Sequence, residues 1–358
     1  MRIVVAMSGG VDSSVAAALL AEQGHEVIGL SMQLYDHTGH AEAGGQRSFG
    51  SCCTLDDLHD ARRVAASLNI PHYILNLERQ FDEQVVSNFV REYAAGRTPL
   101  PCAHCNSDLK FTTLAERARG FGAAAVATGH YARVERDPAT GRYLLKRGAD
   151  PSKDQSYFLF SLTQDQLAHA MFPIGDRGKN AVREYARHRR LPVADKPDSQ
   201  EICFIPDHDY AKFVTKRAPE TDRQGTIVDE HGRVAGRHGG IHRFTIGQRK
   251  GLGLASPSPL YVLALRPAEQ QVVVGPKSAL ERTTLTASDV NWIGGKPRTP
   301  QRVTAQIRHR HQAAPATVHA TDGGSATVVF DAPQIAVTPG QAVVFYDEDI
   351  VVGGGWIG

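Results

Sequence analysis

Apolar and polar positions in the first part of the chain follow two different periods. Short apolar runs predict strands over four segments, the first of them buried: Arg2–Met7, Glu26–Gln33, His72–Asn76 and Ala123–Thr128. Longer segments predict helices: Val11–Gln23, Leu55–Leu68, Gln84–Tyr93 and Thr112–Gly120. Strands that alternate with helices are typical of a parallel sheet covered on both faces. We therefore expect an α/β fold with a doubly wound parallel sheet in the N-terminal half.

The pattern changes after about residue 205, where short alternating runs are separated by Gly, Pro and Asp. Such runs predict strands over eight segments: Gly225–Gly236, His242–Gly247, Leu260–Leu265, Gln271–Gly275, Arg302–Ile307, Ala316–His319, Ala326–Phe330 and Ala342–Asp347. This pattern favours small β-barrels. We expect an α/β domain over residues 1–206, a small β-rich domain over 207–280 and a C-terminal β-barrel over 281–358.

Composition narrows the class of protein. The chain has 358 residues, a formal charge of +2 and five cysteines. No apolar stretch is long enough to span a membrane, and no signal peptide precedes the first strand, so we expect a cytoplasmic protein without a membrane partner. An odd number of cysteines in a chain of this length argues against a disulfide scaffold. The segment His37–Gly50 is rich in Gly, His and Ala, which predicts a loop.

The opening stretch MRIVVAMSGGVDSSVAAALL predicts an anion site. A strand, a glycine turn and a helix start direct backbone N–H groups outward, and the helix dipole favours negative charge. This stretch contains neither G-x-G-x-x-G nor G-x-x-x-x-G-K-[ST], and the first lysine in the chain is Lys110. Asp12 would repel a phosphate unless Mg²⁺ lay between them. The alternative is an ordinary turn capped by Asp12 or Ser13.

Two further stretches carry cysteines in polar, proline-marked contexts. In GRTPLPCAHCNSDLKF (96–111) a loop precedes a helix, which would place Cys105 near the helix N-terminus, where the dipole lowers a thiol pKa. In DKPDSQEICFIP (195–206) Cys203 follows a turn. A buried thiol, half a zinc site and a redox pair stay open as interpretations of these cysteines. Cys52 and Cys53 are as well explained by burial as by function.

The loop SGGVDSS resembles the pyrophosphate loop (PP-loop) of the ATP pyrophosphatases, which adenylate a carbonyl oxygen and release pyrophosphate. Spaced motifs over nearly the full length then resemble the tRNA-specific 2-thiouridylases: AMSGGVDSS, GRTPLPCAHCNSDLKF, ATGHYAR, SKDQSYFL, DSQEICFIP and HRFTIGQRKGLG. The resemblance implies an adenine nucleotide alpha hydrolase-like domain and ATP-dependent 2-thiolation of the wobble uridine (position 34) of tRNA anticodons. ATP and Mg²⁺ are the implied cofactors. The implied partners are the tRNA anticodon stem-loop and a persulfide donor or relay protein.

The resemblance also implies roles for individual residues. Cys105 is the implied nucleophile, Cys203 the implied persulfide carrier, and Asp12 helps to hold Mg²⁺. The implied ATP-binding residues are Ala6, Met7, Ser8, Gly9, Gly10, Val11, Asp12, Ser13, Met32 and Gly129. The residues implied to contact the target base or tRNA are Leu100, Pro101, Cys102, His130, Lys153, Asp154, Gln155, Arg308, His309 and Gln341.

One position departs from the family pattern. Many relatives carry Asn-Pro-Asp where this chain has Leu100-Pro101-Cys102, so that three thiols, Cys102, Cys105 and Cys203, fall at one expected site. Three thiolates with an open position are a possible ligand set for a [4Fe-4S] cluster. Cluster-dependent thiolation is therefore an alternative to a persulfide relay that ends in a Cys105–Cys203 disulfide. Two further hypotheses are a PP-loop ligase that adenylates a small molecule and a non-enzymatic RNA-binding protein.

Basic residues gather in three segments of a nearly neutral chain. These segments are Arg177–Arg190, Arg243–Lys250 and Arg302–His311. Single-stranded anticodon bases are read by phosphate contacts, stacking and hydrogen bonds to base edges. The three segments predict a dispersed tRNA footprint, with the β-rich C-terminal part as its platform.

Overall fold

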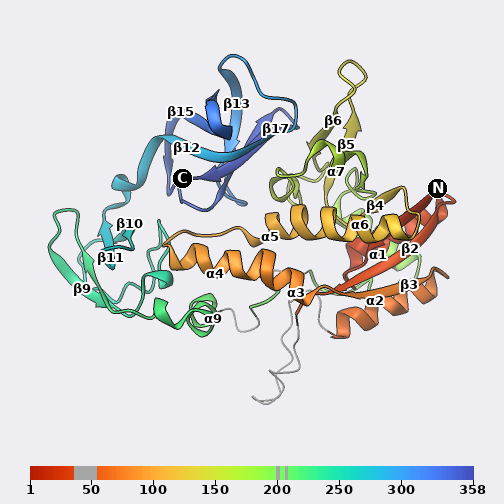
Figure 1. Ribbon diagram of the computed structural model, residues 1–358, viewed down its shortest axis with the longest axis horizontal. Coiled ribbons are helices and arrows are strands. Elements are labelled where there is room, and N and C mark those ends of the chain that lie inside the picture. Colours follow the sequence, from red (N-terminus) through yellow and green to blue (C-terminus); the bar gives the residue numbers. More distant parts are fainter. Residues whose placement is uncertain (36–54, 199–201, 206–208) are drawn as a thin grey trace. The chain divides into compact units, whose positions relative to one another are not determined.

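The computed structural model describes residues 1–35, 55–198, 202–205 and 209–358 (Figure 1). The chain divides into two compact units. Unit 1 holds Met1–Val85, Cys102–His208 and Asp349–Val351, and unit 2 holds Val86–Pro101, Asp209–Glu348 and Val352–Gly358. The predicted loop His37–Gly50 and the residues Cys52 and Cys53 lie outside the described residues.

Unit 1 contains the predicted parallel sheet. Its strands have the order β3-β2-β1-β4-β7, and all neighbours are parallel. Their bounds are β1 Arg2–Ala6, β2 Glu26–Gln33, β3 His72–Asn76, β4 Ala125–Ala127 and β7 Ala170–Met171. The chain runs from β1 to one side through β2 and β3, then returns to place β4 on the other side of β1. The loop after β1 therefore lies at the point where the strand order reverses, which is where open α/β sheets bind ligands.

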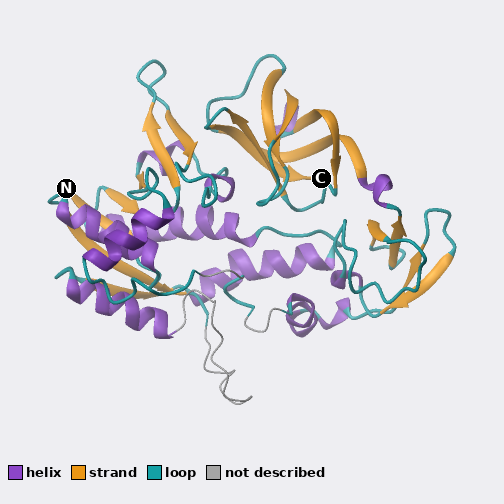
Figure 2. Ribbon diagram, turned by 180° about the vertical axis from the view of Figure 1, so that it is seen from behind, coloured by secondary structure: helices purple, strands orange, loops and turns teal. Residues whose placement is uncertain are grey.

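Helix α1 (Val11–Glu22) is buried on nearly every side, in keeping with its apolar composition. Ala17 and Leu20 pack with the strands and with α2 (Leu55–Ser67). Ala16 and Leu19 pack with α8 (Lys179–His188). Small alanine side chains let helix and strand backbones approach closely at this position. Figure 2 shows helices of unit 1, in purple, beside its strands, in orange.

The helix expected over Thr112–Gly120 begins earlier. Residues 101–120 form one continuous helical stretch: α5 Pro101–His104, the π-helical segment η3 Cys105–Thr113 and α6 Leu114–Gly120. Pro101 has a φ suited to the first helical turn, and its missing N–H costs nothing there. The sequence pattern suggested that this proline belongs to a loop, whereas it starts the helix. Cys105 consequently lies one turn inside the helix rather than at its N-terminus.

The remaining elements of unit 1 include a hairpin that the sequence pattern did not predict, β5 (Ala132–Arg136) with β6 (Tyr143–Arg147). Unit 1 also contains two short helices, α3 (Glu78–Phe81) and α7 (Gln164–Ala168). The π-helical segment η2 (Asp82–Val86) follows α3 and reaches the boundary between the units. Helices α4 (Ser87–Ala94) and α9 (Tyr210–Arg217) belong to unit 2.

Unit 2 contains a four-stranded sheet of order β10-β11-β8-β9. Its strands are β8 Gly225–Val228, β9 Val234–His238, β10 Tyr261–Arg266 and β11 Gln271–Gly275. The strand predicted over His242–Gly247 is wrong, because Ile241–Arg243 forms a 3₁₀ turn. His242 is fully buried there, and its ring bonds to the Thr221 carbonyl and the Thr215 hydroxyl. These bonds fix a turn in a segment whose pattern suggested a strand.

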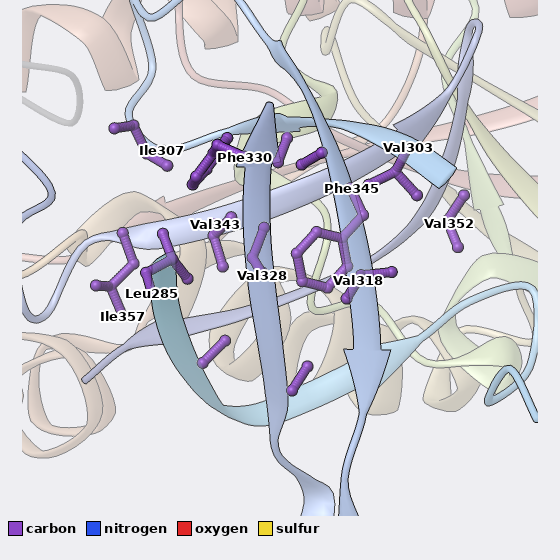
Figure 3. Packing of buried hydrophobic residues seen from close by; sticks show 14 residues of the cluster. Leu285, Val303, Ile307, Val318, Val328, Phe330, Val343, Phe345, Val352 and Ile357 are labelled. Carbon is purple, nitrogen blue, oxygen red and sulfur yellow. The ribbon is translucent and has the colours of Figure 1, made fainter. Parts of the chain in front are cut away.

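Unit 2 also contains a closed six-stranded barrel, as predicted, in which β12 pairs with both β15 and β17. Its strands are β12 Glu281–Trp292, β13 Gln301–Gln306, β14 Ala314–Ala320, β15 Ala326–Ile335, β16 Ala342–Asp347 and β17 Ile350–Ile357. Figure 3 shows Leu285, Val328 and Phe345 among the side chains that fill its interior. The closing strand β17 was missed because of its glycines. Added Cβ atoms at Gly353 and Gly355 would collide with backbone of β12.

Candidate active site

The loop after β1 has the geometry of an anion site. Gly10 is the N-cap of α1, and no side chain of the described residues caps this helix, so the alternative of an ordinary turn capped by Asp12 or Ser13 is wrong. Gly9 has a φ of +71°, and a Cβ there would overlap the backbone carbonyl of Asp57. The turn therefore requires glycine, and it leaves the first-turn amides of α1 uncapped by side chains.

The serines of the loop have different roles. Ser13 and Ser14 are buried, and both hydroxyls donate to the Gly10 carbonyl, at 3.3 and 2.7 Å. The Ser8 amide donates to the Ser13 hydroxyl at 3.2 Å. Ser8 is the exposed member of the three. The buried pair braces the turn, and the Ser8 hydroxyl is the one positioned to meet a ligand.

Asp12 is held by two residues that the sequence did not connect with the loop. The Tyr131 hydroxyl donates to Asp12 Oδ1 at 2.8 Å, and Lys179 Nζ lies 2.8 and 2.9 Å from the two carboxylate oxygens. Burial and the Asp12 carboxylate both raise the pKa of Tyr131 far above its usual range, so its hydroxyl stays a donor. Lys179, at the start of α8, supplies the cation that the loop itself lacks.

Asp198 joins three cations of unit 1. Its carboxylate lies 2.8 Å from Lys153, from Lys179 and from Arg183. Burial by itself would raise the pKa of Asp198, but hydrogen bonds from Lys153 and Lys179 outweigh it and lower this pKa to about 2. Asp198 is therefore ionised at neutral pH. It links the Lys153 loop to the lysine that holds Asp12.

The predicted adenosine-pocket residues lie at the same edge of the sheet as the loop. Met32 is close to the carboxyl end of β2, and Gly129 follows the carboxyl end of β4. A Cβ at Gly129 would lie 2.5 Å from the Ser13 amide nitrogen. The backbone after β4 therefore passes directly against the start of α1, an approach that only glycine permits.

His130 is held as a neutral ring. Its Nδ1 lies 2.6 Å from the Thr128 hydroxyl, and the ring packs against Phe111 and Phe172. Burial and the nearby Lys110 lower the pKa of His130 well below its usual value. This imidazole offers a hydrogen bond rather than a positive charge, and its predicted contact with tRNA stays a prediction.

The Lys153–Gln155 loop is organised by its own side chains. Asp154 accepts from the amides of Gly148 and Ser156 and pairs with Arg147 at 2.9 Å. Gln155 accepts from the Tyr131 amide through its side-chain oxygen. Both side chains thus shape the loop around Tyr131. The predicted tRNA contact of this loop remains a prediction.

Of the three described thiols in unit 1, Cys102 is exposed, whereas Cys105 and Cys203 are partly buried. Phe204, next to Cys203, packs edge-on against Phe81 of α3 with ring centroids 5.5 Å apart. Helix α3 in turn packs against η3, whose first residue is Cys105. Among the described residues, no group of three or more His, Cys, Asp or Glu side chains has the spacing of metal ligands.

Several predicted tRNA residues belong to unit 2. Gln341 donates through Nε2 to the carbonyls of Thr98 and Pro99, which directly precede the predicted base-contacting residues Leu100 and Pro101. Arg308 and His309 are exposed on the barrel. Gln306 holds their turn by donating to both of their carbonyls. The barrel thus fixes the backbone beside the predicted target-base residues.

Many arginines of the predicted basic segments have acidic partners. Arg187 pairs with Asp195, and Arg189 pairs with Glu22, both at 2.9 Å. Arg302 forms a bidentate pair with Asp331. The positive charge available to a polyanion is therefore smaller than the sequence suggests. In the part of the chain that the structure describes, no helix is both long and apolar enough to cross a membrane.

Comparison with known proteins agrees with this architecture. A family described as a tRNA methyl transferase HUP domain matches residues 1–207. A tRNA methyl transferase PRC-barrel domain matches 211–276, and an aminomethyltransferase β-barrel domain matches 282–357.

Named relatives match over nearly the whole chain. The tRNA-specific 2-thiouridylase MnmA of Geotalea uraniireducens is 53% identical over 99% of this chain and 94% of that protein. The same-named protein of Solibacter usitatus is 53% identical, covering 99% and 98%. A solved NMN synthetase from Francisella tularensis covers 61% of this chain and 76% of its own, at 17% identity and a TM-score of 0.35.

The sheet, the glycine turn and the uncapped helix start define a nucleotide-binding α/β domain of the PP-loop class, followed by β-rich domains. Within that class, the chain belongs to the tRNA-specific 2-thiouridylase family.

Proposed function

We propose that this protein catalyses ATP-dependent 2-thiolation of uridine in tRNA, at the wobble position 34 of the anticodon. The observation that carries the proposal is identity of 53% to 2-thiouridylases over 99% of the chain. An adenylating ligase for small molecules and a non-catalytic RNA-binding protein are not favoured by relatives of this kind. A small-molecule ligase also needs no paired thiols.

In the first step, ATP adenylates the C2 oxygen of the uridine and pyrophosphate leaves. The amides at the start of α1 and the Ser8 hydroxyl bind the departing phosphates, while Lys179 holds the Asp12 carboxylate in position beside them. The Asp12 carboxylate is a ligand of the type that Mg²⁺ prefers, and its position at the loop fits that ion. Bound Mg²⁺ would supply further neutralisation of the phosphates. Met32 and Gly129 line the adenosine side.

In the second step, sulfur replaces AMP. The terminal sulfur of a persulfide on Cys203 attacks C2, and AMP leaves with the C2 oxygen, which gives a C2–S–S–Cys203 linkage. The Cys105 thiolate then attacks the Cys203 sulfur, so that the S–S bond to the base breaks and its electrons remain on the thiocarbonyl sulfur. A Cys105–Cys203 disulfide results. A dithiol reductant returns both thiols, and a persulfide donor or relay protein reloads Cys203.

We assign ATP chemistry to residues 1–206, a supporting role to residues 207–280 and tRNA binding to the barrel, residues 281–358. The exposed Arg308 and His309 provide phosphate contacts from the barrel. Gln341 supports Leu100 and Pro101 beside the target base. His130 and the Lys153–Gln155 loop add contacts from the catalytic domain. An unstacked anticodon base is read by contacts of these kinds.

Three serine variants test the thiol roles, with Cys102 as the matched control. Cys105→Ser and Cys203→Ser should each stop formation of 2-thiouridine in an anticodon stem-loop, whereas adenylation, followed as pyrophosphate release, should continue. Cys102→Ser should retain thiolation within about threefold, because the relay uses only two sulfurs. Thiolation by either of the first two variants at the wild-type rate would reject the relay.

Anaerobic purification separates the relay from cluster chemistry. If the relay operates, protein that contains no iron should thiolate tRNA when a persulfide donor is supplied. Near-stoichiometric iron and acid-labile sulfide, both lost in Cys102→Ser together with activity, would instead assign Cys102, Cys105 and Cys203 as ligands of an iron–sulfur cluster.

A further inference from the structure

A second lysine touches the backbone of the phosphate loop itself. Lys196 Nζ donates to the Gly9 carbonyl at 3.1 Å, to Asp57 Oδ1 at 2.6 Å and to Asp60 Oδ2 at 2.7 Å. Burial opposes its charge, but the hydrogen bonds with Asp57 and Asp60 outweigh burial and raise the pKa of Lys196. The ammonium is therefore a permanent cation behind the loop.

This contact determines which way one peptide group faces. In a trans peptide the C=O and the following N–H point in opposite directions, so a Gly9 carbonyl directed at Lys196 turns the Gly10 N–H to the other side. Gly10 is the N-cap of α1, and its N–H belongs to the turn that receives the phosphates. A reversed peptide would present a carbonyl oxygen to the triphosphate.

The two glycines themselves offer little resistance to that reversal. Neither Gly9 nor Gly10 has a Cβ, and glycine adopts positive and negative φ with similar ease. A Gly–Gly peptide is therefore the one in this loop that rotates most cheaply. Lys196 comes from a segment that is anchored separately, since Arg183 of α8 donates to the Lys196 carbonyl at 3.2 Å. The ammonium thus provides a fixed reference for the peptide.

We propose that Lys196 is a positioning residue of the phosphate loop, which holds the Gly9 carbonyl against α2 and keeps the Gly10 N–H directed at the bound phosphates. This inference rests on the proposed ATP-dependent function. Asp57 and Asp60 hold the ammonium in place, and Arg63, 3.3 Å from Asp60, offsets the remaining negative charge. Lys196 acts through the backbone and needs no contact with ATP.

The test compares ligands that contain phosphates with one that does not. Lys196→Met should weaken binding of ATP and of inorganic pyrophosphate about tenfold in titration calorimetry, the order expected for loss of a charged hydrogen bond. Binding of adenosine should stay within about twofold. Lys196→Arg, which keeps a cationic donor, should recover most of the affinity. Lys146→Met is the matched control, because Lys146 also bridges two carboxylates, Glu135 and Asp349.

Equal losses for adenosine and pyrophosphate, or the same loss in Lys146→Met, would overturn the inference. Should Lys196→Met fail to fold, Asp60→Asn replaces it, because this variant weakens the hold on the ammonium that orients the Gly9 carbonyl. It should weaken binding of pyrophosphate more than binding of adenosine, and equal effects on the two ligands would reject a role through Gly9. Wild-type protein that binds pyrophosphate without thiolating tRNA would reject the proposed function alone. Normal thiolation with unchanged pyrophosphate binding in Lys196→Met would reject the inference alone.

Discussion

Two lysines reach the phosphate loop from positions far along the chain. Lys179 lies 167 positions from Asp12, and Lys196 lies 187 positions from Gly9. The SGGVDSS stretch was sufficient to predict an anion site, because its glycines and helix start are local features. The lysines were not predictable in the same way, since only the packing of α8 and of the segment that follows it against α1 brings them to the loop.

Asp12→Asn tests the loop at the level of one side chain. Asparagine keeps the shape of the residue but weakens its hold on Lys179 and on Mg²⁺, so we expect pyrophosphate release to fall about 100-fold or more. The affinity for tRNA, measured by filter binding, should change less than about twofold. Asp137→Asn is the control, because Asp137 lies in the exposed turn of the β5–β6 hairpin. Normal pyrophosphate release by Asp12→Asn would contradict the assignment of the loop.

Substitutions at two glycines test the close approach of the backbone after β4 to the start of α1. The Cβ of Gly129→Ala would lie 2.5 Å from the Ser13 amide nitrogen, so the start of α1 must move. We expect ATP affinity to fall at least about tenfold, with a loss of about 1–3 kcal/mol in unfolding free energy. A Cβ at Gly120, the last residue of α6, meets nothing within 4 Å, so Gly120→Ala should leave ATP affinity unchanged and should not lower the unfolding free energy. Equal effects in both variants would show that the contact at Ser13 is unimportant.

At the scale of helices and strands, an element was predicted correctly where its own residues determine its start and end, and missed where contacts with other elements determine them. Strands β2, β3, β11 and β16 have the predicted bounds, since each is a short run of strand-forming residues that local sequence suffices to delimit. The helix at Pro101 was missed because proline starts helices as well as interrupting them. Strand β17 was missed because its glycines are required by the close approach of the β12 backbone, and local sequence does not show that approach.

Adjacent positions on β15 test the inward and outward alternation of the barrel. Val328 is fully buried in the barrel core, whereas Val329 is 40% exposed. Val328→Ala should lower the unfolding free energy by about 1–3 kcal/mol, because it removes buried methyl groups and leaves a cavity. Val329→Ala should change it by less than about 0.5 kcal/mol. Denaturant unfolding followed by tryptophan fluorescence reports on this barrel, since Trp292 and Trp356, the two tryptophans of the chain, lie on its strands β12 and β17. Similar losses would contradict the assigned register.

At the scale of the molecule, the class of fold followed from the sequence more fully than the distribution of charge. Alternating strands and helices, then short strands, were enough to predict an α/β domain with β-rich domains after it. The tRNA footprint was predicted from the basic segments alone, and the sequence did not show which acidic residues pair with them. In the structure, Arg302 is neutralised by Asp331, whereas the exposed Arg308 donates to the backbone carbonyl of Ile335, which carries no formal charge.

This difference makes the salt dependence of tRNA binding a test of the footprint as a whole. Each phosphate contact releases counterions, so affinity should fall at least about tenfold between roughly 50 and 200 mM salt. Arg308→Ala should lower the slope of log affinity against log salt by about 0.7–0.9, the value for one phosphate contact. Arg302→Ala should leave the slope nearly unchanged, because Asp331 already pairs with that charge. A flat salt response would reject the basic footprint. Equal changes of slope in both variants would show that internal ion pairs do not decide which arginines meet the tRNA.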